Sequence, residues 1–407
     1  MKTGKAFRMA VIGLIGCLAQ GAWAEGTNIT GVVVRQRWPW SPLVDIDYVL
    51  DCEDMQRFDV AVAAYCGTTP VTLPVSSLSG DLYNVSRGAH RIVVDPAKTA
   101  YTNGTFTTLK VNVSPAPIPL YMVIDLMKEA DATNQVTYIY PGDAKLETYG
   151  RWTNVWFGVT NSEYKTDKLV LRRAPPGTFM MGEYPGDRPV TLTKACYVGV
   201  FELTEAQWYR VMGTGSQTAV TPKVRMSYNM LRGATNDVPS VNWYTTGSSV
   251  CPTSFVGRLR AKTGMNDFDL PTDAQWEYCC RAGTTNYYSD GVSTSASDTN
   301  ILNEIGWWNG NSIPVTQHPV GEKAPNGWGL YDTHGNVWEI CLDWHMDSLG
   351  TTKVTDPTGP VSGTKRVARS GVASQGAEGS RTAVRGSYFP DYEIDAWSGV
   401  RIVRTLK

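Results

Sequence analysis

One stretch of this chain, residues 326–344, constrains the fold more than any other. It reads NGWGLYDTHGNVWE up to residue 339 and combines tryptophans, a tyrosine, glycines and acids. Glycine lets another segment approach closely, and Trp328 and Trp338 are large enough to anchor a core. The stretch predicts a tight loop pinned by aromatic side chains. The alternative is a calcium site, because Asp332 and Glu339 supply hard oxygen ligands that nearby backbone carbonyls would supplement.

This loop and two earlier segments resemble the formylglycine-generating enzyme family, also called the sulfatase-modifying factor family. Residues 176–182 read PGTFMMG and are similar to the opening strand of the family. Residues 270–278 read LPTDAQWEY and are similar to its tryptophan-bearing helix. The three segments occur in the order of the family, and the resemblance covers roughly residues 168–405. It implies a C-type-lectin-like fold that is rich in irregular loops.

The resemblance also implies a calcium site. Carried over position by position, the second calcium site of the family falls on the side chains of Asp332 and Glu339 and on the backbone carbonyls of Gly335 and Val337. The first calcium site of the family has no convincing match within residues 301–325. The expected role of calcium is structural, because a bound cation would hold together loops that have no regular hydrogen-bond ladder.

The residues that the family uses for oxidation are missing from this chain. The resemblance implies a copper-holding cysteine pair near the C-terminus, and two soft thiolates suit Cu(I). The matching segment runs from Arg366 to Arg385, but no cysteine follows Cys341. The adjacent Cys279 and Cys280 are interpreted as small buried residues on different helix faces, not as a replacement pair. Copper is therefore not expected as a cofactor.

These features predict an exported sulfatase-modifying-factor family protein that lacks oxidase activity and acts as a calcium-stabilised binding or accessory module. The alternative is an enzyme of the same family that still acts on sulfatases or has altered chemistry. No catalytic or cofactor-binding residue is assigned, because no Gly-x-Ser-x-Gly elbow, phosphate loop or His-Glu-x-x-His motif occurs. The histidines His90, His334 and His345 are interpreted as structural.

A group of arginines in the last segment has two interpretations. They form either salt bridges within a loop-rich fold or an anion-binding rim for a sulfated or carboxylated ligand. The expected partners are accordingly sulfatases or an anionic, glycan-type ligand. The formal net charge of −1 favours neither nucleic acid nor an acidic membrane surface. The arginines are Arg366, Arg369, Arg381, Arg385, Arg401 and Arg404.

The N-terminus has the pattern of an export signal. A basic start precedes the apolar run 9–18, and a small-residue cleavage site ends at Ala24. Cleavage there predicts a secreted or periplasmic protein. Residues 14–17 resemble a bacterial lipobox, so a lipoprotein anchored at Cys17 is the alternative. The apolar run is too short to span a bilayer, and no later transmembrane segment is apparent.

The expected fold class is all-β followed by α+β. Residues 25–115 contain several short runs of alternating apolar and polar residues and predict an immunoglobulin-like β-sandwich. Residues 116–167 are expected to be a proline-rich linker with connecting strands, and residues 168–407 the sulfatase-modifying-factor domain. An exported location would permit a disulfide between Cys52 and Cys66, the two cysteines of the first domain.

Three helices are expected in the second domain, two of them with capping signals. Thr204 and Gln207 form a capping-box pattern ahead of a helix that ends near residue 212. A second helix is expected over residues 254–263. Thr272 is expected to cap a third helix over residues 273–280, whose first turn carries acid where the helix dipole favours it.

Overall fold

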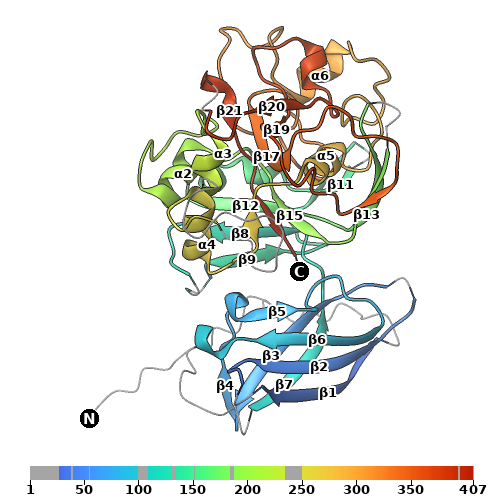
Figure 1. The fold of residues 1–407 in the computed structure, drawn as a ribbon, viewed down its shortest axis with the longest axis vertical. Coiled ribbons are helices and arrows are strands. Elements are labelled where there is room, and N and C mark those ends of the chain that lie inside the picture. The colour runs from blue at the N-terminus through green and yellow to red at the C-terminus, as the bar shows by residue number, and fades with distance from the viewer. Residues whose placement is uncertain are drawn as a thin grey trace. The chain divides into compact units, whose positions relative to one another are not determined.

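The computed structural model describes residues 27–37, 40–54, 56–99, 109–130, 132, 134–150, 152–183, 188–233, 250–392 and 395–406. The predicted signal peptide, residues 1–24, and the alternative lipid site at Cys17 lie outside these residues. The described chain forms two compact units (Figure 1). The first contains the residues up to Pro119 together with 131–140, and the second contains residues 120–130 and 141–406.

Two antiparallel sheets form the first unit and share one buried core. Their strand orders are β1-β2-β6-β5 and β4-β3-β7. Val44, Ile46, Tyr48 and Leu50 of β2 are buried, as the alternating sequence predicts, and they join Val60 of β3 in one apolar cluster. The elements are β1 (Asn28–Gln36), β2 (Val44–Asp51), β3 (Asp59–Cys66), β4 (Thr69–Val71), η1 (Val75–Ser77), β5 (Leu78–Gly80), β6 (Gly88–Val94), η2 (Pro96–Lys98), β7 (Leu109–Ala116) and β9 (Val136–Ile139).

The second unit is built on a sheet in which the strands β16, β22, β15, β12 and β8 are successive neighbours. All these neighbouring pairs are antiparallel. Residues 116–167, which the sequence assigns to a linker with connecting strands, thus supply β8 to this sheet, and the division between the units falls after Pro119. The strand bounds are β8 (Tyr121–Asp125), β12 (Lys168–Ala174), β15 (Cys196–Gly199), β16 (Phe268–Asp269) and β22 (Val403–Thr405).

Two smaller sheets and a two-stranded ribbon complete the strands of the second unit. We call residues 326–339 the aromatic-glycine loop. The sheet β20-β19-β17-β21 contains the strand that continues this loop, because β17 begins at Trp338. The other sheet has the order β13-β14-β18, and β10 pairs with β11. The bounds are β10 (Glu147–Tyr149), β11 (Trp152–Val155), β13 (Gly177–Met181), β14 (Arg188–Leu192), β17 (Trp338–Trp344), β18 (Val354–Thr355), β19 (Arg366–Arg369), β20 (Gly386–Tyr388) and β21 (Ser398–Gly399).

The three predicted helices are confirmed, as are the two predicted caps, and Ser254 caps the second helix, which begins at Phe255. Thr204 and Thr272 each form a complete capping box with the residue three positions on, and Ser254 accepts a hydrogen bond from the backbone of the first turn of its helix. The helical bounds are η3 (Phe157–Thr160), α1 (Glu163–Thr166), α2 (Glu205–Met212), α3 (Tyr228–Arg232), α4 (Phe255–Thr263), α5 (Asp273–Arg281), α6 (Thr299–Ile305), η4 (Ala377–Ser380) and η5 (Asp395–Trp397).

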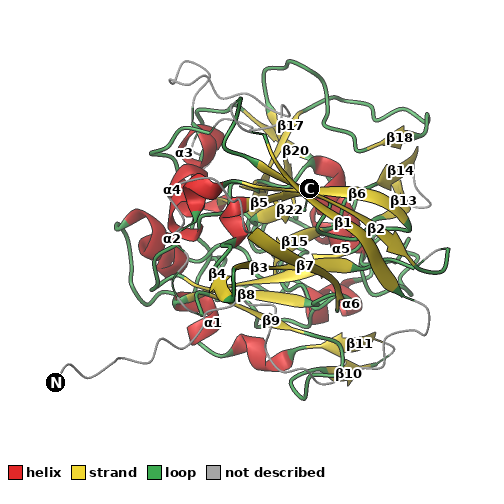
Figure 2. Cartoon of the chain, turned by 90° about the horizontal axis from the view of Figure 1, so that it is seen from below, coloured by secondary structure: helices red, strands yellow, loops and turns green. Residues whose placement is uncertain are grey.

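The described chain is mostly β structure and loop, and its helices are short (Figure 2). The longest, α4 and α5, have nine residues each. None of the helices in the described part of the chain is both long and apolar enough to cross a membrane.

Candidate functional site

The aromatic-glycine loop is fastened to helix α5 at one end. The side-chain amide of Asn326 donates to the carbonyl oxygens of Cys279 and Cys280, at 2.8 and 2.9 Å. Farther along, Gly335 has a φ of +84°, and a Cβ at that position would overlap the carbonyl oxygen of Trp307. Glycine is therefore required there both for the left-handed backbone and for the close approach of the neighbouring loop.

Asp332 lies in this loop with a buried carboxylate that is only half satisfied. One of its oxygens, Oδ2, accepts the backbone N–H of Gly321 at 2.6 Å, whereas Oδ1 is buried without a hydrogen-bond partner. Burial raises the pKa of the carboxyl to about 6, because the charged form has lost its hydration. A buried oxygen without a donor is the kind of atom that a cation or a proton would satisfy.

Glu339 is held differently, by a guanidinium and an indole. Arg401 donates to both of its carboxylate oxygens, with the shortest contact at 2.7 Å, and Trp276 donates its indole N–H at 2.6 Å. Neither Glu339 nor Arg401 is more than 1% exposed. This buried, multiply bonded ion pair links the loop to the segment just before β22 and to helix α5.

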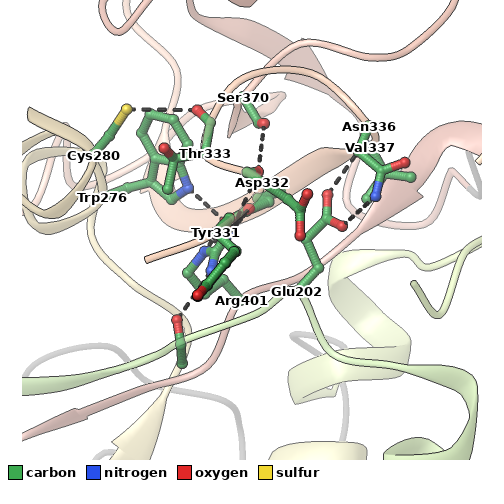
Figure 3. A network of polar contacts seen from close by, with 12 residues as sticks. Glu202, Trp276, Cys280, Tyr331, Asp332, Thr333, Asn336, Val337, Ser370 and Arg401 are labelled. Atoms are coloured by element: carbon green, nitrogen blue, oxygen red, sulfur yellow. Dashed lines mark hydrogen bonds and ion pairs between the residues drawn. The ribbon is translucent and has the colours of Figure 1, made fainter. Parts of the chain in front are cut away.

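Glu202 is a third acid of this site, and sequence reasoning missed it. Its carboxylate accepts the side-chain amide of Asn336 at 2.6 Å and the backbone N–H of Val337 at 3.2 Å (Figure 3). Burial raises the pKa of Glu202 well above its ordinary value, and the negative charges of Asp332 and Glu339 raise it further. The available signal was an acid inside the apolar run Val200–Leu203, where a charged residue needs a specific partner.

The buried network has more acids than bases. Glu202, Asp332 and Glu339 face Arg401 and the nearly buried Lys165, whose pKa burial lowers. Such an excess can be neutralised by protons or by a bound cation. We refer to these five residues as the acidic network.

The four residues that the sequence proposes for calcium all belong to this loop, but their oxygens are not equally available. Asp332 offers an oxygen without a partner, whereas Glu339 is paired with Arg401 and the carbonyl of Gly335 accepts the hydroxyl of Ser370 at 2.8 Å. Among the described residues, no group of three or more His, Cys, Asp and Glu side chains is arranged to hold a metal. A calcium site here would therefore rely on Asp332 and on backbone carbonyls such as that of Val337.

Residues 366–385, the segment that the sequence matches to the cysteine-bearing region of the family, contain several closely packed side chains. Ser370, Ala373 and Ser380 are fully buried, and Thr382 is nearly so. His334 of the aromatic-glycine loop binds the carbonyl oxygen of Ser380 through Nδ1, at 2.8 Å. Burial lowers the pKa of this histidine to about 4, which fits a neutral structural residue.

The arginines of the last segment are engaged within the chain. Arg369 pairs with Asp273 and Glu277 of α5, where Asp273 also accepts a hydrogen bond from Arg385. Arg401 and Arg404 are also buried and paired with acids, and Arg366 donates to a backbone carbonyl. The structure thus supports internal salt bridges for most of this group. Arg381, which pairs with Glu183, is the most exposed arginine among these ion pairs.

The adjacent cysteines of α5 meet different surroundings, as expected. Cys280 lies near the carbonyl oxygen of Thr333 and shares an apolar cluster with Trp276 and Cys341. Cys279 instead neighbours Cys196 of β15, which raises the pKa of the Cys279 thiol. Both are buried and have different neighbours, which fits the interpretation of small buried residues on different helix faces.

Comparison with known families matches the second unit. The sequence profile of the sulfatase-modifying factor enzyme 1-like domain matches residues 158–406, which is more than half of the chain. The formylglycine-generating enzyme of Thermomonospora curvata is 37% identical over 117 residues, and that of Mus musculus is 36% identical over 112 residues. These alignments cover 25% of this chain and only 37% and 29% of the respective relatives.

Other similar proteins have different names. The chaperone protein LppX of Paenibacillus barcinonensis is 25% identical over 222 residues, which cover 44% of this chain and 72% of that protein. Among solved structures, Treponema denticola variable protein 1 has a TM-score of 0.46 at 22% identity, covering 58% of this chain and 95% of that one. PvdO from Pseudomonas aeruginosa has a TM-score of 0.44 at 21% identity, with the same coverage.

Proposed function

Because the chain belongs to the family of the sulfatase-modifying factor enzyme 1-like domain, we propose that it is an exported member without oxidase activity, acting as a calcium-stabilised binding or accessory module. One observation carries the proposal: no cysteine follows Cys341, so the two soft thiolates needed for Cu(I) are missing from the C-terminal segment. The close packing around Ser380 supports it, because that segment serves the core of the unit.

The oxidase part is tested with the full chain, copper, oxygen and a Cys-x-Pro-x-Arg peptide. The expected result is a peptide whose mass stays the same as in a blank without protein. Conversion of the peptide cysteine to formylglycine above that blank would overturn the proposal. It would favour the alternative, an enzyme that still acts on sulfatases.

The calcium part of the proposal rests on charge. The acidic network has an excess of acids, and Asp332 Oδ1 is buried without a partner. In the proposed site, Asp332 holds calcium together with the carbonyls of Gly335 and Val337. Glu339 completes the set mainly through its charge, since Arg401 and Trp276 already engage its oxygens. Calcium would neutralise the excess charge and tie the loop together.

Thermal unfolding of the full chain tests this site. Calcium in large excess over a chelator is expected to raise the melting temperature of the second unit, which contains the site. At a hundred times the dissociation constant, binding to the native state alone adds about 2.7 kcal/mol. Asp332→Asn is expected to abolish the increase, and the matched control Asp347→Asn, at a fully exposed acid, is expected to keep it. A wild-type melting temperature indifferent to calcium would remove calcium and leave the non-oxidase proposal intact.

The finer architecture and location belong to the same proposal. Two sheets with one shared core support an immunoglobulin-like sandwich in the first unit. The family assignment supports a C-type-lectin-like second unit. N-terminal sequencing of exported protein is expected to begin after Ala24, giving a secreted or periplasmic protein. Lipid-modified Cys17 at the mature N-terminus would establish the lipoprotein alternative instead.

For the partner, we propose a sulfatase or an anionic, glycan-type ligand. Arg381 is the arginine of the last segment best placed for such a ligand, because its side chain is 22% exposed and its acid partner Glu183 is 47% exposed. Arg381→Ala is expected to weaken binding to a sulfated polysaccharide relative to wild type. Equal binding by both proteins would exclude Arg381 from the contact.

A further inference from the structure

Two buried thiols lie together in the second unit, outside the acidic network. Cys196 is the first residue of β15 and Cys279 belongs to α5, and each is 2% exposed. The two are neighbours, since Cys196 is the first of the groups that raise the pKa of Cys279. The two positions are far apart in sequence, so a bond between them would join two separate elements of the fold.

The placement of α5 on the sheet accounts for this contact. Cys196 pairs with Thr405 across the β15–β22 ladder. The hydroxyl of Thr405 accepts the side-chain amide of Gln275 at 3.0 Å, and Gln275 is one helical turn before Cys279. Residues four positions apart lie on the same helix face. The face of α5 that meets β22 and β15 therefore presents Cys279 towards Cys196.

From this geometry we propose that Cys196 and Cys279 form a disulfide in the mature protein, linking the sheet to helix α5. The step is a two-electron oxidation by a disulfide donor, such as oxidised glutathione or an exchange enzyme. One thiolate attacks a sulfur of the donor and expels a thiol, and the second thiolate displaces the other half. Two donor thiols result, which take the two protons. The location rests on the proposed export, because an oxidising compartment preserves such bonds.

Burial fixes when the bond forms. A disulfide donor reaches only an accessible thiolate, and the pKa of Cys279 is raised well above its ordinary value, first by the hydrogen bond with Cys196 and then by burial. The reaction therefore belongs to the folding chain, before α5 closes on β15. Once formed, the bond is shielded from reductants by the same packing.

The link would act on the acidic network through α5. This helix carries Trp276, whose indole N–H is bound by Glu339, and its carbonyl at Cys279 is held by Asn326. A covalent bond at Cys279 would thus fix the helix between the sheet and the aromatic-glycine loop.

Other cysteine pairs are less suited to form a disulfide. The thiols of Cys280 and Cys341 share one apolar cluster, but each is directed to a backbone carbonyl, of Thr333 and of Glu339 respectively. The structure contains no disulfide between described residues, neither from Cys196 to Cys279 nor from Cys52 to Cys66 in the first unit.

The test uses the full chain refolded in a glutathione redox buffer, so that its outcome does not depend on export. The protein is denatured with an alkylating agent and no reductant, digested and analysed by mass spectrometry. We expect one linked pair of peptides, containing Cys196 and Cys279, lighter than the two free peptides by two hydrogen atoms. Wild type refolded with reductant should melt at a lower temperature than wild type refolded in the redox buffer, whereas Cys196→Ala should show no such difference.

The matched control is Cys280→Ala, at the neighbouring position of the same helix. This variant is expected to keep the linked peptides, whereas Cys196→Ala is expected to leave Cys279 fully alkylated. Complete alkylation of both cysteines in the refolded wild type would overturn the inference, as would a link from either of them to another cysteine. Failure here leaves the peptide-oxidation test of the proposed function unaffected.

Discussion

Arg401→Met is expected to destabilise the second unit more than Glu339→Gln. Arg401 donates to both oxygens of Glu339 and to the carbonyl oxygens of Gly199, Val200 and Tyr331. Methionine fills similar space but leaves a buried carboxylate without its cation. Removing one member of a buried ion pair costs about 3–5 kcal/mol, and the three carbonyls that lose a donor place this variant at the upper end of that range.

The opposite substitution is expected to be milder. In Glu339→Gln, Arg401 remains close to the negative charges of Glu202 and Asp332. The amide oxygen still accepts hydrogen bonds, so the expected loss is about 1–2 kcal/mol, the scale of a weakened charged hydrogen bond. The double variant should recover part of the Arg401→Met loss, because no stranded charge remains.

Calorimetric unfolding of the full chain measures this difference, with the transitions of the two units analysed separately. A loss of 3–5 kcal/mol corresponds to a melting temperature lower by about 6–20 °C for a domain of this size. The Arg401→Met loss should be smaller near pH 5 than near pH 8, because protonation of Asp332, whose pKa burial raises to about 6, reduces the unbalanced negative charge. If Glu339→Gln loses as much stability as Arg401→Met or more, the idea that the site holds an excess of buried acid is wrong. If the stability loss of Arg401→Met does not depend on pH, the idea that this variant leaves a buried negative charge unpaired is wrong.

Three further substitutions test individual groups. Burial, and then the negative charge of Asp273, raise the pKa of Asp343 from its ordinary value of 3.8 to about 8. The stability from this group is fully present below pH 3.8 and is lost as pH rises through 8. Asp343→Asn should therefore flatten the pH dependence of the melting temperature in this window, and an unchanged slope would contradict the expectation. Burial lowers the pKa of His334 from 6.5 to about 4. The stability that the neutral histidine contributes is present above pH 6.5 and is lost as pH falls through 4. His334→Gln should therefore make the unfolding free energy from urea titrations less sensitive to acid, and an acid sensitivity equal to that of wild type would contradict this. Thr272→Ala removes the capping box of α5 and should cost about 1–2 kcal/mol in chemical denaturation, whereas Thr272→Ser should restore most of it; equal losses in both would point to packing instead.

Local features of the fold could be predicted from the sequence because their causes are local. The caps at Thr204 and Thr272 depend on residues within one turn, and both helices begin where these signals place them. The buried face of β2 likewise follows from alternation within the strand. The aromatic-glycine loop can be predicted for the same reason, since its glycines and aromatic residues are close together in sequence.

The partners of the site could not be predicted, because they come from distant segments. Arg401 reaches Glu339 from the end of the chain, and Glu202 reaches Asn336 from the turn after β15. No spacing rule connects such positions. The contact between Cys196 and Cys279 was missed for the same reason, since the sequence directed attention to the adjacent Cys280.

The place of β22 in the central sheet has a consequence for biosynthesis. This strand, Val403–Thr405, pairs with β15 on one side and β16 on the other, although both precede it by well over a hundred residues. The sheet therefore cannot be completed during translation or translocation until residue 405 has emerged, because the position between β15 and β16 stays unpaired until then. Arg401 becomes available to Glu339 at the same late stage. Long-range pairing of this kind slows folding. Until β22 inserts, the nascent second unit exposes unpaired strand edges and apolar surface, to which a chaperone that holds unfolded chains would bind.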